Sequence, residues 1–387
     1  MKDDTLLGHT GNAPFENHGI INPPVYHAST ILFPTLDAFR NASTAKVRYG
    51  RRGTPTSFAL EEAITELERG HGTIAVPSGM AAIASALLAC LKAEDHLLVT
   101  DSVYGPTRHF CETTLKRYGV ETEYYDPLIG GDIERLMRPE TRVVFVEAPG
   151  TGTFEIQDIP AISAAAHKGG ALVIADNTWG AGYYFKPLTK GADVVVQAGT
   201  KYVVGHSDTM MGLVTCADEG LYKRMRDDIQ ALGMCCGPDD IYLALRGMRT
   251  MGVRMDRHYE SAMKVASWLK SRPEVMRVMY PALDDDPGHA LWKRDFTGAC
   301  GLFGFILHNR DQKALAAMMD GLTLHGMGFS WGGYESLLIP TAPEKARSAT
   351  KWDVDGQCMR IHVGLEDPDD LIADLEAGLE RMGKATK

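Results

Sequence analysis

The chain has 387 residues, of which 44% are hydrophobic and 23% are charged, and its formal net charge is −10. This composition excludes the disordered, collagen-like and coiled-coil classes, and the acidic balance without long basic clusters argues against nucleic acid as a partner. No apolar run approaches the roughly 20 residues of a membrane span and no signal-peptide pattern is present, so we expect a cytoplasmic protein without a membrane partner, whose seven cysteines stay reduced.

Residues 1–53 show no sustained helical period and contain recurring prolines and glycines, among them Pro23, Pro24 and Gly50. A segment of this kind has no core of its own, so it must pack on something else to stay ordered. We therefore predict an N-terminal arm over residues 1–53.

Residues 54–247 alternate helical stretches with short apolar runs. The runs that predict strands cover residues 73–76, 96–100, 120–124, 142–146, 171–175 and 193–196. One helix face is predicted by the apolar residues Leu60, Ala63, Ile64 and Leu67. This alternation indicates an α/β fold with a mostly parallel central sheet and helices on both faces. Ligands of such sheets bind at the carboxyl ends of the strands.

Residues 248–387 have a looser pattern, which predicts a smaller α+β domain. A helix is expected near residues 253–271, and strands are expected near residues 302–307 and 359–363. The last helix is expected to begin at a cap provided by Asp369 or Asp370, with Leu371, Leu375 and Leu379 on its apolar face.

Three features follow predicted strands of the larger domain. Ser78, Gly79 and Met80 open a helix after the first strand, Asp176 ends the fifth, and Lys201 follows the sixth. Each alone has an ordinary explanation, namely a turn, a helix cap or a lysine that extends to solvent. Together they supply what a pyridoxal phosphate enzyme requires: a helix start for the phosphate, an acid for the pyridine nitrogen and a lysine for the aldehyde.

Five segments of the chain resemble the Cys/Met-metabolism family of pyridoxal phosphate enzymes. The resemblance runs from about residue 8 to the last helix, and it implies the fold-type I architecture of the aspartate aminotransferase type. The bacterial members that cleave the Cβ–S bond of cystathionine are the most similar. The segments are Tyr49-Gly50-Arg51-Arg52-Gly53-Thr54, Ser78-Gly79-Met80, Asp176-Asn177-Thr178, Thr200-Lys201-Tyr202 and Ser330-Trp331-Gly332-Gly333.

The resemblance implies cofactor roles for individual residues. Lys201 would bind pyridoxal 5′-phosphate and move the substrate Cα proton, and Tyr104 would stack on the cofactor ring; these two are the expected catalytic residues. Asp176 would pair with the pyridine nitrogen. The phosphate would be held by Gly79, Met80 and Thr200, together with Tyr49 and Arg51 of a neighbouring subunit. Such sharing implies a homo-oligomer, expected to be a tetramer built from dimers.

The resemblance also implies a site for the substrate, an amino acid. Arg360 would bind the substrate carboxylate, with Ser330 and Trp331 lining the same pocket, and a guanidinium suits two-point binding of a carboxylate. Ala198 departs from the family pattern, because many members have a serine at this position as a further phosphate ligand. No metal ion is expected, since the chain has none of the common metal-ligand spacings.

The reaction type is indicated by positions around residue 330. Members that act at the γ-carbon carry a glutamate where this chain has Phe329, and usually a leucine where it has Trp331; Pro106 after Tyr104 and Gly105 also resembles the β-acting members. We expect Phe329 to lie in apolar surroundings near the distal end of the substrate. The expected reaction is β-elimination of L-cystathionine to homocysteine, pyruvate and ammonia. A γ-lyase, a γ-synthase and a cysteine-S-conjugate β-lyase remain open.

Two other classes of enzyme have partial motifs. Ser207 in Gly205-His206-Ser207-Asp208-Thr209 approaches the nucleophile elbow of serine hydrolases, but Thr209 replaces its final glycine. Gly150-Thr151-Gly152 begins like a dinucleotide-binding fingerprint and lacks the third glycine.

Overall fold

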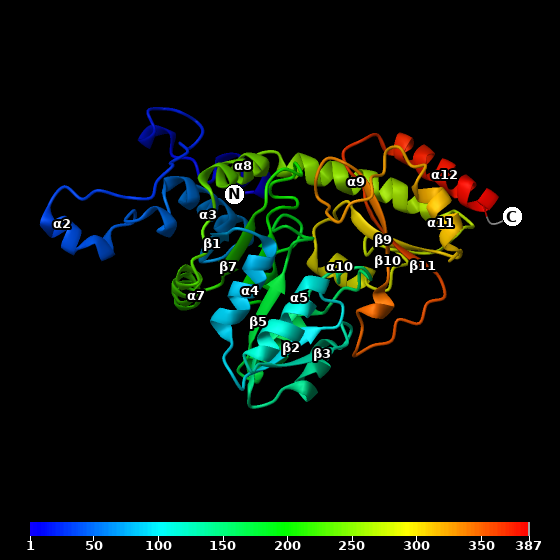
Figure 1. Ribbon diagram of the computed structural model, residues 1–387, viewed down its shortest axis with the longest axis horizontal. Helices are drawn as coiled ribbons and strands as arrows, with labels where there is room; N and C mark the ends of the chain where they lie inside the picture. The colour runs from blue at the N-terminus through cyan, green and yellow to red at the C-terminus, as the bar shows by residue number, and fades with distance from the viewer. Residues whose placement is uncertain (386–387) are drawn as a thin grey trace.

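The computed structural model describes residues 1–385, which form a larger and a smaller α/β body with a projecting arm (Figure 1). The larger body is built on a seven-stranded sheet in the order β1-β7-β6-β5-β4-β2-β3. Its strands are β1 (Gly72–Val76), β2 (His96–Thr100), β3 (Glu121–Tyr125), β4 (Thr141–Glu147), β5 (Leu172–Asp176), β6 (Val194–Ala198) and β7 (Gly212–Cys216).

The helices of the larger body cover both faces of this sheet. Apolar side chains on one face pack under α4 and α7, and those on the other face belong to a core that continues into the smaller body. The helices are α3 (Pro55–Glu68), α4 (Gly79–Cys90), α5 (Gly105–Phe110), α6 (Ile159–Lys168), α7 (Glu219–Ala231) and α8 (Pro238–Met248). A π-helix (Cys111–Leu115) extends α5, and 3-10 helices cover Gly130–Leu136 and Pro187–Lys190.

The smaller body has an antiparallel sheet in the order β10-β11-β9-β8. Helices cover this sheet, and α9 runs from the larger body along the smaller one (Figure 1). The elements are α9 (Met251–Lys270), β8 (Val275–Met279), α10 (His289–Asp295), β9 (Leu302–Leu307), α11 (Gln312–Met319), β10 (Leu337–Thr341), a 3-10 helix (Pro343–Lys345), β11 (Gln357–His362) and α12 (Pro368–Ala385).

After its first nine residues, the arm projects away from both bodies (Figure 1). Its short helices are α1 (Asp3–His9), α2 (Leu36–Arg40) and the 3-10 turns Pro14–Glu16, Ala42–Thr44 and Gly50–Arg52. Helix α1 packs on the chain's own larger body through the buried Leu6 and Leu7. Beyond it, apolar side chains stand in the open, with Phe15 96% and Leu32 88% exposed. An apolar surface of this kind is typical of a segment that contacts another molecule.

The predicted fold class is confirmed, and the six predicted strands coincide with β1 to β6 within two residues at each end. Strand β7 was not predicted; it pairs antiparallel with β1 and β6 and follows β6 without an intervening helix, so it breaks the alternation of strands and helices. Helix α1 was likewise not predicted. The cap expected at Asp369 or Asp370 is wrong, because Asp367 precedes Pro368 and its carboxylate accepts from the Asp369 N–H at 2.9 Å. No helix among residues 1–385 is long and apolar enough to cross a membrane.

Candidate active site

A cavity of about 240 Å³ opens at the carboxyl edge of the larger sheet, where it meets the smaller body. Loops after β2, β4, β5 and β6 form its floor and walls, and β11 with the loop before β10 closes the other side. Eight residues predicted from the sequence lie in its lining: Gly79, Met80, Tyr104, Asp176, Thr200, Lys201, Trp331 and Arg360. The structure therefore brings most of the predicted site together.

Lys201 lies just after β6 and points its amine toward the smaller body. Its Nζ donates a hydrogen bond to Ser330 Oγ at 2.8 Å and lies 5.4 Å from the ring centre of Trp331. Burial, followed by the nearby positive charge of Arg360, lowers the pKa of Lys201 to about 8. An amine with this pKa is partly uncharged near neutral pH and can act as a nucleophile or a base.

The loop that carries Ser330 lies directly on Lys201. Gly332 has φ +86°, and a Cβ there would lie 2.9 Å from Cα of Lys201, so only glycine fits without a shift. The Gly332 N–H donates to Nε2 of His362 at 3.1 Å, and burial holds the pKa of His362 well below its usual value, which keeps the ring neutral. This contact fixes the loop between Lys201 and β11.

Asp176 is the last residue of β5, and its carboxylate faces the cavity. Oδ1 accepts hydrogen bonds from the Thr178 N–H at 3.0 Å and the Thr178 hydroxyl at 2.6 Å. Burial nevertheless raises the pKa of Asp176, and none of the ion pairs formed by residues 1–385 involves it. A buried carboxylate without a cation is costly, so a positive partner is missing at this position.

Glu147 is a site residue that the sequence analysis missed. It ends β4 in register with Asp176 and lines the same cavity. Its carboxylate accepts from the Tyr104 N–H at 2.8 Å and, through the other oxygen, from the Thr151 hydroxyl. Burial and then the charge of Asp176 raise the pKa of Glu147. Its position in the sequence could have indicated this role, because Glu147 follows a predicted apolar strand in the same way as Asp176 does.

The other end of the cavity lies at the start of α4. Ser78 caps this helix by accepting from the Ala81 N–H at 3.1 Å, and a Cβ on Gly79 would lie 2.5 Å from Cβ of Ala198. The absence of a side chain at Gly79 lets the helix start approach the end of β6. The Thr200 hydroxyl is already paired with Met211, donating to its carbonyl at 3.2 Å and accepting from its N–H at 2.9 Å.

Arg360 lies on β11 and reaches the cavity from the smaller body. Its guanidinium donates only to backbone carbonyls, those of Phe329 at 3.2 Å and Ser330 at 3.3 Å, so no carboxylate neutralises it within these contacts. Phe329 stands at the mouth and is 94% exposed. The expectation that Phe329 lies in apolar surroundings is therefore wrong for the single chain, because the loop turns this side chain out to solvent.

Tyr49 and Arg51 do not reach this cavity. They line a separate one of about 440 Å³ between the arm and helices α7 and α8. There Arg51 Nη1 donates to the Gln230 carbonyl at 2.5 Å, and Tyr49 is 46% exposed. Within one chain the two residues cannot contact a group held by Lys201.

The motifs of the other enzyme classes lack the geometry they require. The Ser207 hydroxyl donates to Glu335, at 2.5 Å and 2.7 Å to its two oxygens, while the neighbouring His206 ring pairs with the Val204 carbonyl. Ser207 thus has a carboxylate partner where a hydrolase needs a histidine. The segment Gly150–Gly152 follows β4 but leads into a loop that lines the cavity, so it does not open a nucleotide-binding helix.

The chain is similar to known proteins over nearly its whole length. Residues 4–380 match the family model described as Cys/Met metabolism PLP-dependent enzyme. A putative cystathionine beta-lyase of Rhizobium johnstonii is 52% identical over 97% of this chain and 95% of its own, and the cystathionine beta-lyase MetC of Escherichia coli is 43% identical over 98% and 99%. The crystal structure of a cystathionine gamma synthase from Xanthomonas oryzae superposes with a TM-score of 0.92 at 31% identity, covering 100% of this chain and 99% of that one.

Proposed function

Because the chain belongs to the Cys/Met metabolism family of PLP-dependent enzymes, we propose that it binds pyridoxal 5′-phosphate on Lys201 and is a cystathionine β-lyase. The reaction is the β-elimination of L-cystathionine to homocysteine, pyruvate and ammonia. One observation carries the proposal: a single cavity is lined by Lys201, Asp176 and Arg360. The pKa of Lys201 is lowered, and within the described residues Asp176 has no cation as a partner and Arg360 has no carboxylate.

The residues of the cavity fit this cofactor. Asp176 lacks a positive partner, which a protonated pyridine nitrogen would supply. The side chain missing at Gly79 leaves the start of α4, with its free N–H groups, open to a phosphate. The Thr200 hydroxyl would have to exchange its Met211 partner to join the phosphate site, so backbone groups are expected to contribute most of the binding there.

When bound, pyridoxal phosphate supplies a ring that withdraws electrons from the substrate Cα and stabilises the negative charge formed there. Lys201 would hold the cofactor and would take the proton from the substrate Cα on its Nζ, an amine that Ser330 Oγ orients. Asp176 keeps the pyridine nitrogen protonated. Burial raises the pKa of Tyr104, so its phenol stays neutral while its ring covers one face of the cofactor.

Arg360 binds the substrate carboxylate, which replaces the two weak carbonyl contacts of its guanidinium. Trp331 lines the same end of the cavity, and Ser330 adjoins it through its hydrogen bond with Lys201. Two observations favour β-elimination over the γ-reactions: Phe329 and Trp331 stand where γ-acting members differ, and the relatives at 52% and 43% identity carry the name cystathionine beta-lyase. The fold alone does not distinguish the two reactions, since a γ-synthase superposes on the whole chain with a TM-score of 0.92.

The second part of the proposal is a site shared between subunits. Two observations support it. The arm has exposed apolar side chains, and Tyr49 and Arg51 lie outside the cavity of Lys201 in the same chain. In a dimer the two residues would reach the phosphate bound to the other chain, and two dimers would form the tetramer. The cytoplasmic location stays a prediction from the sequence.

The products formed from L-cystathionine test the reaction type. Purified protein supplied with pyridoxal phosphate should release pyruvate and homocysteine in equal amounts, with little 2-oxobutyrate or cysteine. Lys201→Ala, assayed alongside, controls for turnover by free cofactor and should give neither keto acid. A predominance of 2-oxobutyrate would replace the β-lyase with a γ-lyase, and no keto acid from the wild type would reject both.

A further inference from the structure

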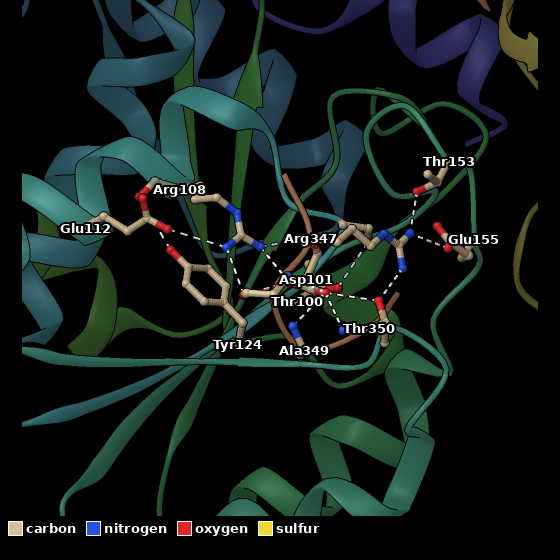
Figure 2. A network of polar contacts seen from close by, with 12 residues as sticks. Thr100, Asp101, Arg108, Glu112, Tyr124, Thr153, Glu155, Arg347, Ala349 and Thr350 are labelled. Atoms are coloured by element: carbon tan, nitrogen blue, oxygen red, sulfur yellow. Dashed lines mark hydrogen bonds and ion pairs between the residues drawn. The ribbon is translucent and has the colours of Figure 1, made fainter. Parts of the chain in front are cut away.

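A loop of the smaller body is bound tightly to the carboxyl edge of the larger sheet. Residues 347–350 lie between β10 and β11, the strand that carries Arg360. Figure 2 shows that this loop reaches Asp101 and Arg108 on one side and the loop with Thr153 and Glu155 on the other. The contacts are polar and run between segments that are far apart in the chain.

Asp101 follows β2 directly and is the first anchor of the loop. Its side chain is 0% exposed, and its two oxygens accept from three consecutive backbone N–H groups: Ser348 at 2.9 Å, Ala349 at 3.0 Å and Thr350 at 2.8 Å. The guanidinium of Arg108 adds a contact at 2.6 Å. Burial would raise the pKa of Asp101, but these donors outweigh it, and the pKa lies below its usual value.

Arg347 is the second anchor. Its guanidinium donates to the Thr153 hydroxyl at 2.7 Å, to the Glu155 carboxylate, and to the Thr350 hydroxyl at 2.7 Å (Figure 2). The side chain is only 7% exposed. Arg347 therefore ties the loop of the smaller body to the segment that follows β4.

Both anchors adjoin parts of the cavity that would contact the cofactor ring. Asp101 is three residues before Tyr104, and Thr153 adjoins the cavity-lining segment Gly150–Gly152. The two segments also touch each other, because the Thr151 N–H donates to the Ser102 carbonyl at 2.8 Å, and a Cβ on Gly150 would lie 2.3 Å from Ser102 Oγ. A displacement at either anchor would thus be transmitted to Tyr104 and to the glycine segment.

We propose that Asp101 and Arg347 are positioning residues. Asp101 binds the backbone of residues 348–350 and Arg347 binds Thr153 and Glu155, and together these contacts form a clasp that holds Tyr104 and Gly150–Gly152 against the cofactor ring. The inference rests on the proposed function, because it assumes that the cavity binds pyridoxal phosphate. The clasp also joins the strand of Arg360 to the wall that carries Tyr104, so it sets the separation between the substrate-carboxylate site and the ring.

The chain contains a matched control for this role. Asp374 on α12 has a side chain that is 6% exposed, and it also accepts from three consecutive N–H groups: Thr323 at 2.9 Å, Leu324 at 3.0 Å and His325 at 3.2 Å. All of these residues belong to the smaller body, and none lines the cavity. Asp374→Asn removes the same kind of interaction as Asp101→Asn without touching the clasp.

The experiment titrates pyridoxal phosphate into apoprotein and follows the visible circular dichroism of the bound cofactor. Asp101→Asn should raise the cofactor dissociation constant by about tenfold or more and weaken the dichroism per bound cofactor, because the ring is held less rigidly. Asp374→Asn should lower the melting temperature but change the dissociation constant by less than about twofold. The proposal is overturned if the two variants change both readouts equally, or if both bind cofactor like the wild type.

A second variant covers the case in which Asp101→Asn does not fold. Arg347→Gln keeps Asp101 and its three N–H donors, so it should fold and still weaken cofactor binding and dichroism, and Arg347→Lys should restore part of both. Cofactor binding by Arg347→Gln that matches the wild type would also overturn the clasp. Failure of the wild type itself to bind pyridoxal phosphate would instead reject the proposed function.

Discussion

Asp101 and Asp176 occupy comparable places, one just after β2 and the other at the end of β5, yet their surroundings differ. Asp101 is enclosed by backbone N–H groups and Arg108, which hold its pKa below the usual value. Among the described residues 1–385, Asp176 accepts only from the N–H and hydroxyl of Thr178, and burial raises its pKa. The described residues therefore give Asp101 a cation and three N–H donors, but they give Asp176 no cation.

The same contrast separates two arginines. Arg347 is paired with the Glu155 carboxylate and two hydroxyls, whereas Arg360 contacts only backbone carbonyls at 3.2 Å and 3.3 Å. Asp101 and Arg347, which have partners of opposite charge, form the wall of the site. Asp176 and Arg360, which have none within the described residues, mark where cofactor and substrate bind. Missing partners are therefore more informative than burial alone, since all four side chains are largely shielded.

The largest effect is expected on kcat, after substitution of the Asp176 carboxylate. Asp176→Asn should lower kcat by a factor on the order of 10³, because a neutral amide does not keep the pyridine nitrogen protonated. The melting temperature of the apoprotein should not fall, since the change removes a buried charge without a cation. Asp101→Asn should lower that melting temperature by several degrees. Thermal unfolding of the apoproteins measures this difference. Equal destabilisation by the two variants would contradict the inferred difference between the surroundings of Asp101 and Asp176.

The next effect concerns the guanidinium without a carboxylate. Arg360→Lys should raise KM for L-cystathionine by about 10–100-fold, because an ammonium cannot bind a carboxylate at two points. Arg257 provides the control, since its guanidinium likewise donates to a backbone carbonyl, that of Glu366 at 3.1 Å, outside the cavity. Steady-state kinetics should show an unchanged KM for Arg257→Lys. An unchanged KM for Arg360→Lys would remove Arg360 from the substrate site.

A smaller effect is expected at the subunit boundary. Arg51→Ala should raise the dissociation constant of pyridoxal phosphate by about tenfold, since a charge-assisted hydrogen bond is lost. Arg48→Ala, which removes an arginine bonded within the arm to the Ser43 carbonyl, is the control and should bind normally. At a cofactor concentration too low to load Arg51→Ala, mixing this variant with Lys201→Ala chains should restore activity, because one kind of hybrid site is intact. Hybrids that form without activity would contradict the shared site.

The smallest effect is a pH dependence of the apoprotein. Folding raises the pKa of Glu147 above its ordinary value of 4.5, so the unfolded chain releases this proton first as the pH rises. Stability should therefore fall from about pH 4.5 up to the raised pKa of the folded state, and Asp176 adds to the same trend. Glu147→Gln removes the titrating group while its one amide oxygen can still accept from the Tyr104 N–H, and it should flatten the fall. Thermal unfolding across this range that shows the same slope in both proteins would contradict the shift.

The sequence predicted those parts of the site that local patterns encode. Lys201, Asp176 and Gly79 each follow an apolar strand, and parallel strands bring their carboxyl ends to one edge, so their convergence could be foreseen. Strand β7 could not, because it returns antiparallel without a helix. The three N–H groups bound by Asp101 lie 247 to 249 residues farther along the chain, and no local pattern indicates such a contact. The outward orientation of Phe329 depends on how its loop packs on Lys201, which residue type does not determine.

The most direct test of the account is the identity of the lysine that binds the cofactor. Holoprotein is reduced with borohydride, which fixes a carbonyl cofactor to its amine, and the peptides are then examined by mass spectrometry. We expect the cofactor to be attached to Lys201 alone and Lys201→Ala to carry none. Attachment to another lysine, such as Lys186 or Lys190, or no attachment in the wild type, would contradict the assignment of the cavity as the cofactor site.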